Sequence, residues 1–326
     1  MENTTRLLER QCDELADRKW ALVNANDAAA PSMSGCVYSH ADRPVAAGVD
    51  VAMLPTLPHG VDLVVLLLPK SLEHLEFLLA ALAGQLDQAC ELWLVGPTRG
   101  GIKGGMTRLS RYAGQVRSLD SARHCKLVSA MLSPQPFSLS AWTRTFSARR
   151  GAQPALEVTS YPGVFNHGTL DEGTALLLDA MADVAAPQTV LDVGCGAGVI
   201  SAVMAAAGSG VTALDVSATA VAATQATLAA NQLAGTVLQS DLYDAVTPGA
   251  QFNWLVTNPP FHDGSERTLG ITRRLIESAP QLLLPGGQLW LVANQGLAYH
   301  DWLEKAFARV IVAAENRRFR VYRAWH

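Results

Sequence analysis

A short apolar strand that runs directly into a glycine-rich turn constrains the fold of this chain most. Residues Thr189 to Gly198 read TVLDVGCGAG, and the helix-like run VISAVMAAAG follows. Gly194, Gly196 and Gly198 let the backbone approach a ligand closely at the carboxyl end of a strand, where open α/β sheets bind their ligands. The spacing is G-x-G-x-G, not the G-x-G-x-x-G of dinucleotide-binding folds, and Asp192 opens the loop. The pattern predicts a ligand site at this turn.

Three further apolar runs are expected to end in polar residues at the same edge of the sheet. VTALD ends at Asp215, where an acid can accept hydrogen bonds from both ribose hydroxyls of a nucleoside cofactor. GTVLQSD ends at Asp241, which suits an adenine amino group, and FNWLVT is followed directly by Asn258. Each residue alone has an ordinary structural explanation, but the ordered set predicts an α/β fold that binds a nucleoside cofactor.

The tetrapeptide Asn258-Pro259-Pro260-Phe261 follows the last of these strands. Two consecutive prolines fix φ and remove two backbone donors, so nearby carbonyl groups are left without ladder partners. The amide oxygen of Asn258 and the carbonyl of Pro259 can each accept one hydrogen of a planar amine, while Phe261 offers a face for stacking. A stiff turn without further function is the alternative for these four residues.

These motifs resemble a known family. DVGCGAG, LDVS, SDLY and NPPF are similar to the motifs of class I S-adenosylmethionine methyltransferases that act on exocyclic or amide nitrogens. The longer segments NPPFHDG, YPGVFNHGTLDEGTALLL and FRVYRA resemble the small-subunit (16S) ribosomal RNA guanine-N2 methyltransferases of the RsmC type. The resemblance is strong over residues 155–326 and weak before them. Large-subunit enzymes share NPPFH but usually continue differently, so they are the second choice.

The resemblance implies transfer of a methyl group from S-adenosylmethionine to the N2 amine of a guanine in small-subunit rRNA. The cofactor-binding residues that it implies are Asp192, Gly194, Gly196, Gly198, Asp215, Asp241, Leu242, Asn258, Phe165 and Thr174. The target amine would be held by Asn258, Pro259, Pro260 and Phe261. The guanine that carries it must be unpaired or flipped to reach them. His262 is the candidate if a base is needed, and holding the loop is its alternative role. No metal is required, because the sulfonium already activates the methyl group.

A loop and a helix start precede the glycine strand. Thr169 followed by Glu172 has the spacing of a capping box, so a helix is expected to begin just after Thr169. The resemblance places Phe165 and the segment 171–174 over the methionine end of the cofactor.

Two other classes of function remain open. A protein glutamine or DNA adenine amino-methyltransferase would use the same Asn/Asp-Pro-Pro-aromatic chemistry, although the glutamine enzymes more usually carry tyrosine at the last position. A ribosome-assembly factor that binds RNA without catalysis is the other alternative. The intact glycines of the loop, together with Asp215 and Asn258, argue against a loss of catalysis.

The first half of the chain repeats the order of the second. VDLVVLLLPK, a helical run and ELWLVGP correspond to FNWLVTNPPF, a helical run and QLWLVAN. A repeat of this size predicts two tandem Rossmann-like α/β domains that arose by duplication. The first copy lacks the glycine loop and carries Leu68-Pro69-Lys70 in place of the Asn-Pro-Pro-Phe tip. We expect a degenerate methyltransferase-like domain over 1–150, with a supporting or RNA-binding role, and a catalytic domain over 151–326.

A basic stretch closes the first half. Between Arg99 and Arg150 there are ten Lys and Arg residues against one acid, in a chain whose net charge is −4. Such polarisation is typical of phosphate binding, and a glycine-rich loop, RGGIKGGMTR, lies within it. The RNA-binding candidates are Arg99, Lys103, Arg108 and Arg111. A solvated basic linker is the alternative.

Composition favours a cytoplasmic protein. The 326 residues, 49% of them hydrophobic, are enough for two cores. Five cysteines form no C-x-x-C pair, which argues for reduced thiols and against a zinc site. The charged amino terminus is unlike a signal peptide, and no apolar run approaches the ~20 residues that span a bilayer. We expect ribosomal RNA, within the small subunit, as the partner of a monomer that needs no membrane or metal.

Overall fold

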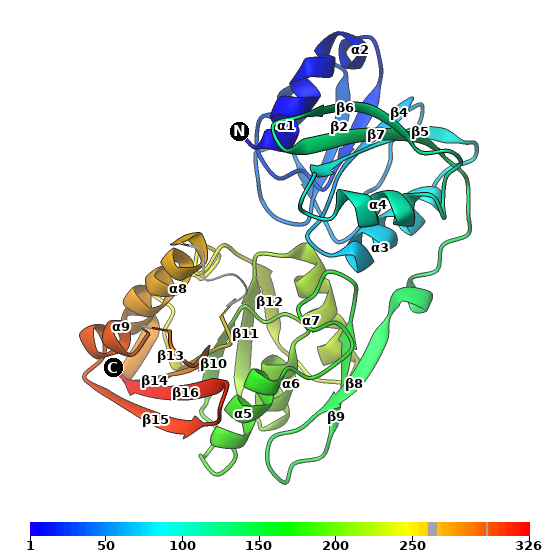
Figure 1. Cartoon of the computed structure of the whole chain (residues 1–326). Coiled ribbons are helices and arrows are strands. Elements are labelled where there is room, and N and C mark those ends of the chain that lie inside the picture. The colour runs from blue at the N-terminus through cyan, green and yellow to red at the C-terminus, as the bar shows by residue number, and fades with distance from the viewer. Residues whose placement is uncertain (260–265, 298) are drawn as a thin grey trace. The chain divides into compact units, whose positions relative to one another are not determined.

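The computed structural model describes residues 1–259, 266–297 and 299–326. The chain forms two compact units, Met1–Trp142 and Thr143–His326 (Figure 1). The strand β8 (Arg144–Ala148), which precedes the expected boundary at residue 150, pairs with β9 (Leu156–Ser160) of the second unit. The passage from one unit to the other therefore lies ahead of β8.

The first unit is an α/β domain built on a seven-stranded sheet. Its helices and strands are α1 (Asn3–Leu8), α2 (Cys12–Ala16), β1 (Trp20–Val23), β2 (Cys36–Ala41), β3 (Asp50–Val51), β4 (Leu63–Leu67), α3 (Leu72–Ala83), β5 (Cys90–Pro97), α4 (Ile102–Leu109), β6 (Arg117–Ala122) and β7 (Cys125–Leu132). The strand order is β3-β2-β1-β4-β5-β7-β6, and β7 pairs antiparallel with both of its neighbours.

The second unit contains a second seven-stranded sheet beside the β8–β9 pair. Its further elements are α5 (Glu172–Ala180), β10 (Thr189–Val193), α6 (Val199–Ala206), β11 (Gly210–Asp215), α7 (Ala218–Ala230), β12 (Thr236–Gln239), β13 (Phe252–Thr257), α8 (Glu266–Ser278), β14 (Leu283–Asn294), α9 (Tyr299–Ala306), β15 (Arg309–Glu315) and β16 (Phe319–Trp325). The order β12-β11-β10-β13-β14-β16-β15 repeats that of the first sheet position by position. The prediction of two tandem α/β domains is confirmed.

The central strands of the second sheet are apolar on both faces, as expected for parallel strands covered by helices. Leu255 of β13 belongs to a buried cluster with Leu275 of α8 and Leu303 of α9. Its neighbour Trp254 faces the other way, and its ring lies 5.4 Å from that of Trp290. Among the helices that the structure describes, none is long and apolar enough to cross a membrane.

The register of the second sheet brings the expected strand ends to one edge. In the parallel ladders, Val193 of β10 lies opposite Leu214 of β11 and Thr257 of β13. The Thr257 hydroxyl donates a 2.8 Å hydrogen bond to the Val193 carbonyl, which links the ends of β13 and β10. The residues that follow β10, β11 and β13 therefore start from neighbouring points, as the order of the motifs predicted.

The basic stretch of the sequence is not one continuous surface. Arg150 is 4% exposed, and its guanidinium donates to the carbonyl oxygens of Met181 and Val184 in the second unit. This side chain satisfies carbonyl groups beyond the end of α5, a structural role. It is therefore not available to a phosphate group.

The glycine-rich segment of the first unit is a helix, not the expected loop. Gly104 and Gly105 lie within α4, and a Cβ atom on them would stand 2.6 Å from Leu72 Cδ1 and 3.0 Å from Leu68 Cδ1. These glycines let the helix approach its neighbours closely. Their presence is explained by packing inside the domain.

Candidate functional site

The glycine loop between β10 and α6 has the backbone that only glycine adopts easily. Gly194, Gly196 and Gly198 have φ values of 75°, 56° and 79°. A Cβ on Gly194 would meet no described atom within 4 Å, and one on Gly196 only Val164 Cγ1 at 4.0 Å. At Gly198 a Cβ would lie 2.9 Å from Thr224 Cα in α7. The first two glycines border open space, whereas the third permits helix packing.

Asp215, at the end of β11, holds this loop. Its Oδ2 accepts the backbone N–H of Gly196 at 3.0 Å, and its Oδ1 accepts that of Ser217 at 2.9 Å. A carboxylate oxygen can accept further hydrogen bonds beside these. The residue predicted to bind a ribose thus also shapes the turn that would face the cofactor.

Asp192 is fully buried beneath the loop. Its Oδ2 accepts a 2.6 Å hydrogen bond from Ser201 Oγ, while Oδ1 has no partner among the described residues. The pKa of this carboxyl is raised to about 7, mainly by burial and to a smaller extent by the nearby charge of Asp215, against the lowering effect of the hydrogen bonds with Ser201. An acceptor without a partner inside the protein is a feature of a site that takes a polar ligand.

The segment after β12 places the third predicted acid at the surface. The strand ends at Gln239, two residues before the expected end, and Asp241 is exposed in the following turn. Leu242 has a φ of 50° and packs against the core cluster that contains Leu255. Its position in the left-handed region is uncommon for a leucine and fixes the path of this turn.

Asn258, directly after β13, has a defined amide orientation. Its Nδ2 donates to Asp171 Oδ2 at 2.9 Å and to Thr174 Oγ1 at 2.8 Å. Both amide hydrogens are therefore used, and Oδ1 is buried without a partner among the described residues. Pro259 is buried behind it, while Pro260, Phe261 and His262 lie outside the described residues.

Asp171 is a site residue that the sequence interpretation assigned differently. It is the N-cap of α5 and accepts the backbone N–H of Thr174 at 2.9 Å, so the expected capping box at Thr169 is wrong. Thr169 lies in a preceding turn, where its N–H bonds to the carbonyl of Asn166. The signal that could have identified Asp171 is its own preference for N-caps, three residues before Thr174.

The two remaining cofactor candidates lie in the same stretch. Thr174 is buried and contacts Asn258 as described above, whereas the side chain of Phe165 is 45% exposed. Val164, next to Phe165, approaches Gly196. The segment before α5 therefore lies beside the glycine loop.

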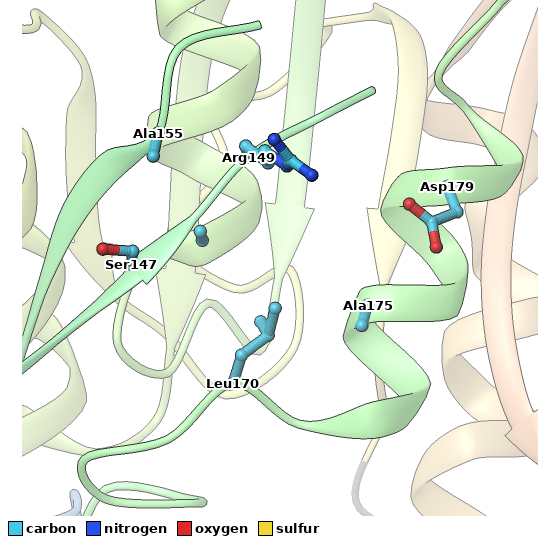
Figure 2. Close-up of a pocket in the computed structure, with 7 residues that line it drawn as sticks. Ser147, Arg149, Ala155, Leu170, Ala175 and Asp179 are labelled. Atoms are coloured by element: carbon cyan, nitrogen blue, oxygen red, sulfur yellow. The ribbon is translucent and has the colours of Figure 1, made fainter. Parts of the chain in front are cut away.

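A cavity of about 360 Å³ lies elsewhere in the second unit (Figure 2). Ser147 and Arg149 line it from the β8 side, and Ala175 and Asp179 line it from α5. Figure 2 shows Arg149 and Asp179 on opposite sides of the opening. None of the strand-end residues that follow β10, β11 or β13 lines this cavity. It is separate from the predicted site.

The four RNA-binding candidates differ in their surroundings. Arg108 and Arg111 both form ion pairs with Glu76, the second at 2.7 Å. Arg99 and Lys103 are exposed, and within the described part of the chain neither has an ion pair. The basic charge that Arg108 and Arg111 present is thus partly neutralised inside the first unit.

In the first unit the matching edge is filled by its own side chains. Asn24 follows β1, as Gly194 follows β10, and its Nδ2 donates to the carbonyl of Leu67 at 2.9 Å. Leu68, in the place of Asn258, packs so closely that a Cβ on Gly96 would lie 2.7 Å from it. The first unit therefore has an apolar leucine where the second has the carboxamide of Asn258, and its neighbouring Asn24 is bonded within the unit.

Comparison with known proteins identifies the family of the chain. The family model of the methyltransferase small domain matches residues 155–323, and the model of its N-terminal part matches residues 5–146. Ribosomal RNA small subunit methyltransferase C of Alcanivorax borkumensis is 49% identical over 329 residues, which cover 99% of each chain. The protein of the same name from Chromohalobacter salexigens is 40% identical over 98% of this chain and 96% of its own.

A solved structure is similar along nearly the whole chain. It is that of the T. thermophilus 16S rRNA N2 methyltransferase (RsmC) in complex with AdoMet and guanosine, at 25% identity and a TM-score of 0.82. The similarity covers 97% of this chain and 91% of that one. The chain therefore belongs to the family of ribosomal RNA small subunit methyltransferase C, as its motifs predicted.

Proposed function

We propose that this chain transfers a methyl group from S-adenosylmethionine to the exocyclic N2 amine of a guanine in small-subunit rRNA. The family supports this function, and the T. thermophilus relative was solved with AdoMet and guanosine. The observation that carries the proposal is the carboxamide of Asn258. Its two amide hydrogens are bonded inside the protein, so its oxygen is the atom left to accept a hydrogen from an amine.

The described residues fit S-adenosylmethionine. Gly194 and Gly196 leave room for a ligand at the end of β10, and Asp215 supplies acceptors suited to ribose hydroxyls. The unpartnered Oδ1 of Asp192 suits a donor at the methionine end, where a cationic amino group is found. Asp241 and Leu242 come shortly after β12, and we propose that they contact the adenine.

The chemistry asks the protein mainly for placement. S-adenosylmethionine, when bound, supplies a methyl group that its sulfonium has already activated. Asn258 Oδ1 accepts one hydrogen of the guanine amine, and the carbonyl of Pro259 accepts the other. An amine held in this way has its lone pair withdrawn from the guanine ring. The lone pair then points out of the plane of the ring, toward the methyl group. The same two acceptors stabilise the positive charge that develops on nitrogen, and its proton then leaves to water.

The substrate follows from the family rather than from charge. A match over 99% of a small-subunit enzyme favours small-subunit rRNA over the large-subunit, protein and DNA alternatives. We further propose that the rRNA is modified within the small subunit, by a monomer in which the first domain supports RNA binding. Exposed Arg99 and Lys103 support that role of the first domain.

The test is transfer of a tritiated methyl group to isolated small subunits, large subunits and protein-free rRNA, followed by nucleoside analysis. We expect N2-methylguanosine in small-subunit rRNA alone, with assembled subunits the better substrate. Label in adenine, in protein or in large-subunit rRNA would overturn the proposed function. Preference for protein-free rRNA would leave the chemistry intact and overturn the assembled context.

A further inference from the structure

We propose that Asp171 is a positioning residue that fixes which atom of the Asn258 carboxamide faces the target amine. This inference rests on the proposed function, since it names the residue that makes Asn258 an acceptor. A carboxamide presents an oxygen acceptor on one side and an NH₂ donor on the other, in nearly the same volume. Only the oxygen can bind an amine hydrogen, so the enzyme needs a group that selects this orientation.

The contacts around Asp171 make this selection. One oxygen, Asp171 Oδ2, accepts from the Thr174 backbone N–H at 2.9 Å and from Asn258 Nδ2 at 2.9 Å. An ionised carboxylate has no hydrogen to donate, so only the NH₂ side of Asn258 can face it. Thr174 Oγ1, at 2.8 Å, takes the other amide hydrogen. The reversed carboxamide would bring its oxygen against a carboxylate oxygen, which is repulsive.

Asp171 itself is held from two directions. Its role as N-cap ties the carboxylate to the first turn of α5. That turn packs closely against β16: a Cβ on Gly173 would lie 3.0 Å from both Asp171 Oδ2 and Phe319 Cδ1. Glu172 adds an ion pair with Arg318 at 2.6 Å on the outside of the turn. The first turn of α5 thus connects Asn258 to the sheet through contacts 87 residues apart in sequence.

Two substitutions separate the positioning role from the cap. Asp171→Gly removes the acceptor for Asn258, and glycine is tolerated as an N-cap at little loss of stability. Asp171→Asn keeps one side-chain oxygen, which can still accept from both Thr174 and Asn258. In the full-length protein we expect Asp171→Gly to lower kcat about 10-fold or more, the effect of losing a charge-assisted hydrogen bond. Asp171→Asn should restore most of that loss.

The readouts distinguish positioning from a general structural defect. Thermal unfolding and the Kd for S-adenosylmethionine should differ little between Asp171→Gly and wild type, whereas kcat falls. Equal kcat values in the two would overturn the proposal, as would a fall in Asp171→Asn as large as in Asp171→Gly. Asn258→Ala, measured in parallel, tests the proposed function separately. If it lowers kcat while Asp171→Gly does not, only the positioning role fails.

Discussion

The carboxylate of Asp215 and the backbone N–H of Gly196 form a 3.0 Å hydrogen bond that closes the glycine loop against β11. Gly196 has a positive φ, and its carbonyl also accepts a 3.0 Å hydrogen bond from Thr224 Oγ1, so the Asp215 bond is one of two that hold its position. The second carboxylate oxygen bonds the N–H of Ser217, which caps α7 through its side chain. One acid therefore sets both the loop before α6 and the start of the next helix.

Asp215→Ala should weaken S-adenosylmethionine binding by about 1.5–3 kcal/mol, the usual contribution of hydrogen bonds to a charged group. Because the loop loses its acceptor too, the thermal midpoint should also fall, while the rate at saturating cofactor largely recovers. Calorimetry measures the affinity. Asp179→Ala, at an exposed acid of α5 that is not among the proposed cofactor residues, is the control. An unchanged Kd in Asp215→Ala would mean that the ribose does not lie at the end of β11.

Asn258→Ala should lower turnover by about 10²–10³, as expected when one preorganised polar group is removed from a reacting centre. Its effect on cofactor affinity should be much smaller, since the ribose and adenine residues lie on other strands. Asn253 is a matched control at the opposite end of β13, where its Oδ1 accepts from Thr189. Asn253→Ala should lower stability and leave turnover near that of wild type. Comparable turnover in the two variants would contradict the assignment of Asn258.

The buried carboxyl of Asp192 predicts a pH-dependent stability. Its folded pKa of about 7 lies above the ordinary value of 3.8, so between these pH values the folded protein keeps a proton that the unfolded chain has released. Stability should therefore fall as pH rises through this window, by up to roughly 4 kcal/mol. In Asp192→Asn, which cannot ionise, this fall should disappear.

Chemical denaturation of both proteins at pH 5 and pH 8 checks this expectation. The difference in unfolding free energy between wild type and Asp192→Asn should change with pH. The exposed Asp179 provides the control, since Asp179→Asn should follow wild type at both pH values. Parallel pH curves for wild type and Asp192→Asn would show that Asp192 is ionised throughout.

The role of the first domain predicts a salt-dependent RNA affinity. Arg99→Ala combined with Lys103→Ala should weaken binding to small-subunit RNA and flatten the slope of log K against log salt by about 1–2 units. Arg108→Ala with Arg111→Ala should have a smaller effect, because Glu76 already partly neutralises both side chains. Filter binding over a salt series measures the slopes. Wild-type slopes in both double variants would favour a basic linker that only supports the second domain.

The sequence predicted the strand ends well because local signals define them. A run of apolar residues followed by glycine, acid or Asn-Pro places Gly194, Asp215 and Asn258 without knowledge of the rest of the fold. The internal repeat likewise predicted two domains, and the common strand order confirms them. These features depend on residues that are close together along the chain.

What the sequence did not predict depends on contacts between distant segments. The bond between Asp171 and Asn258 joins residues 87 positions apart, and no local pattern specifies it. The sequence alone predicts a loop at the glycines of α4. The actual reason for these glycines, their tight packing on Leu68 and Leu72, is visible only in the structure. The sequence alone places Arg150 among the surface charges, because it does not show the carbonyl groups that the guanidinium binds.

Gly173→Ala tests whether the close packing of α5 matters to the site. The new Cβ would lie 3.0 Å from Asp171 Oδ2 and from Phe319 Cδ1, tighter than ordinary contact, so the first turn must shift. We expect a loss of about 1–3 kcal/mol in the free energy of unfolding, as for other overpacked sites. Turnover should fall as well, because Asp171 moves relative to Asn258. Thermal unfolding and methyl transfer measure the two effects.

Gly270→Ala is the matched control for this substitution. Gly270 also lies inside a helix, α8, but a Cβ there would meet no described atom within 4 Å. Alanine at this position should therefore stabilise the protein by about 1 kcal/mol, through helix propensity alone, without changing turnover. If Gly173→Ala behaves like Gly270→Ala, then α5 can move away from β16 without cost. The rigid link from β16 through Asp171 to Asn258 would then be refuted.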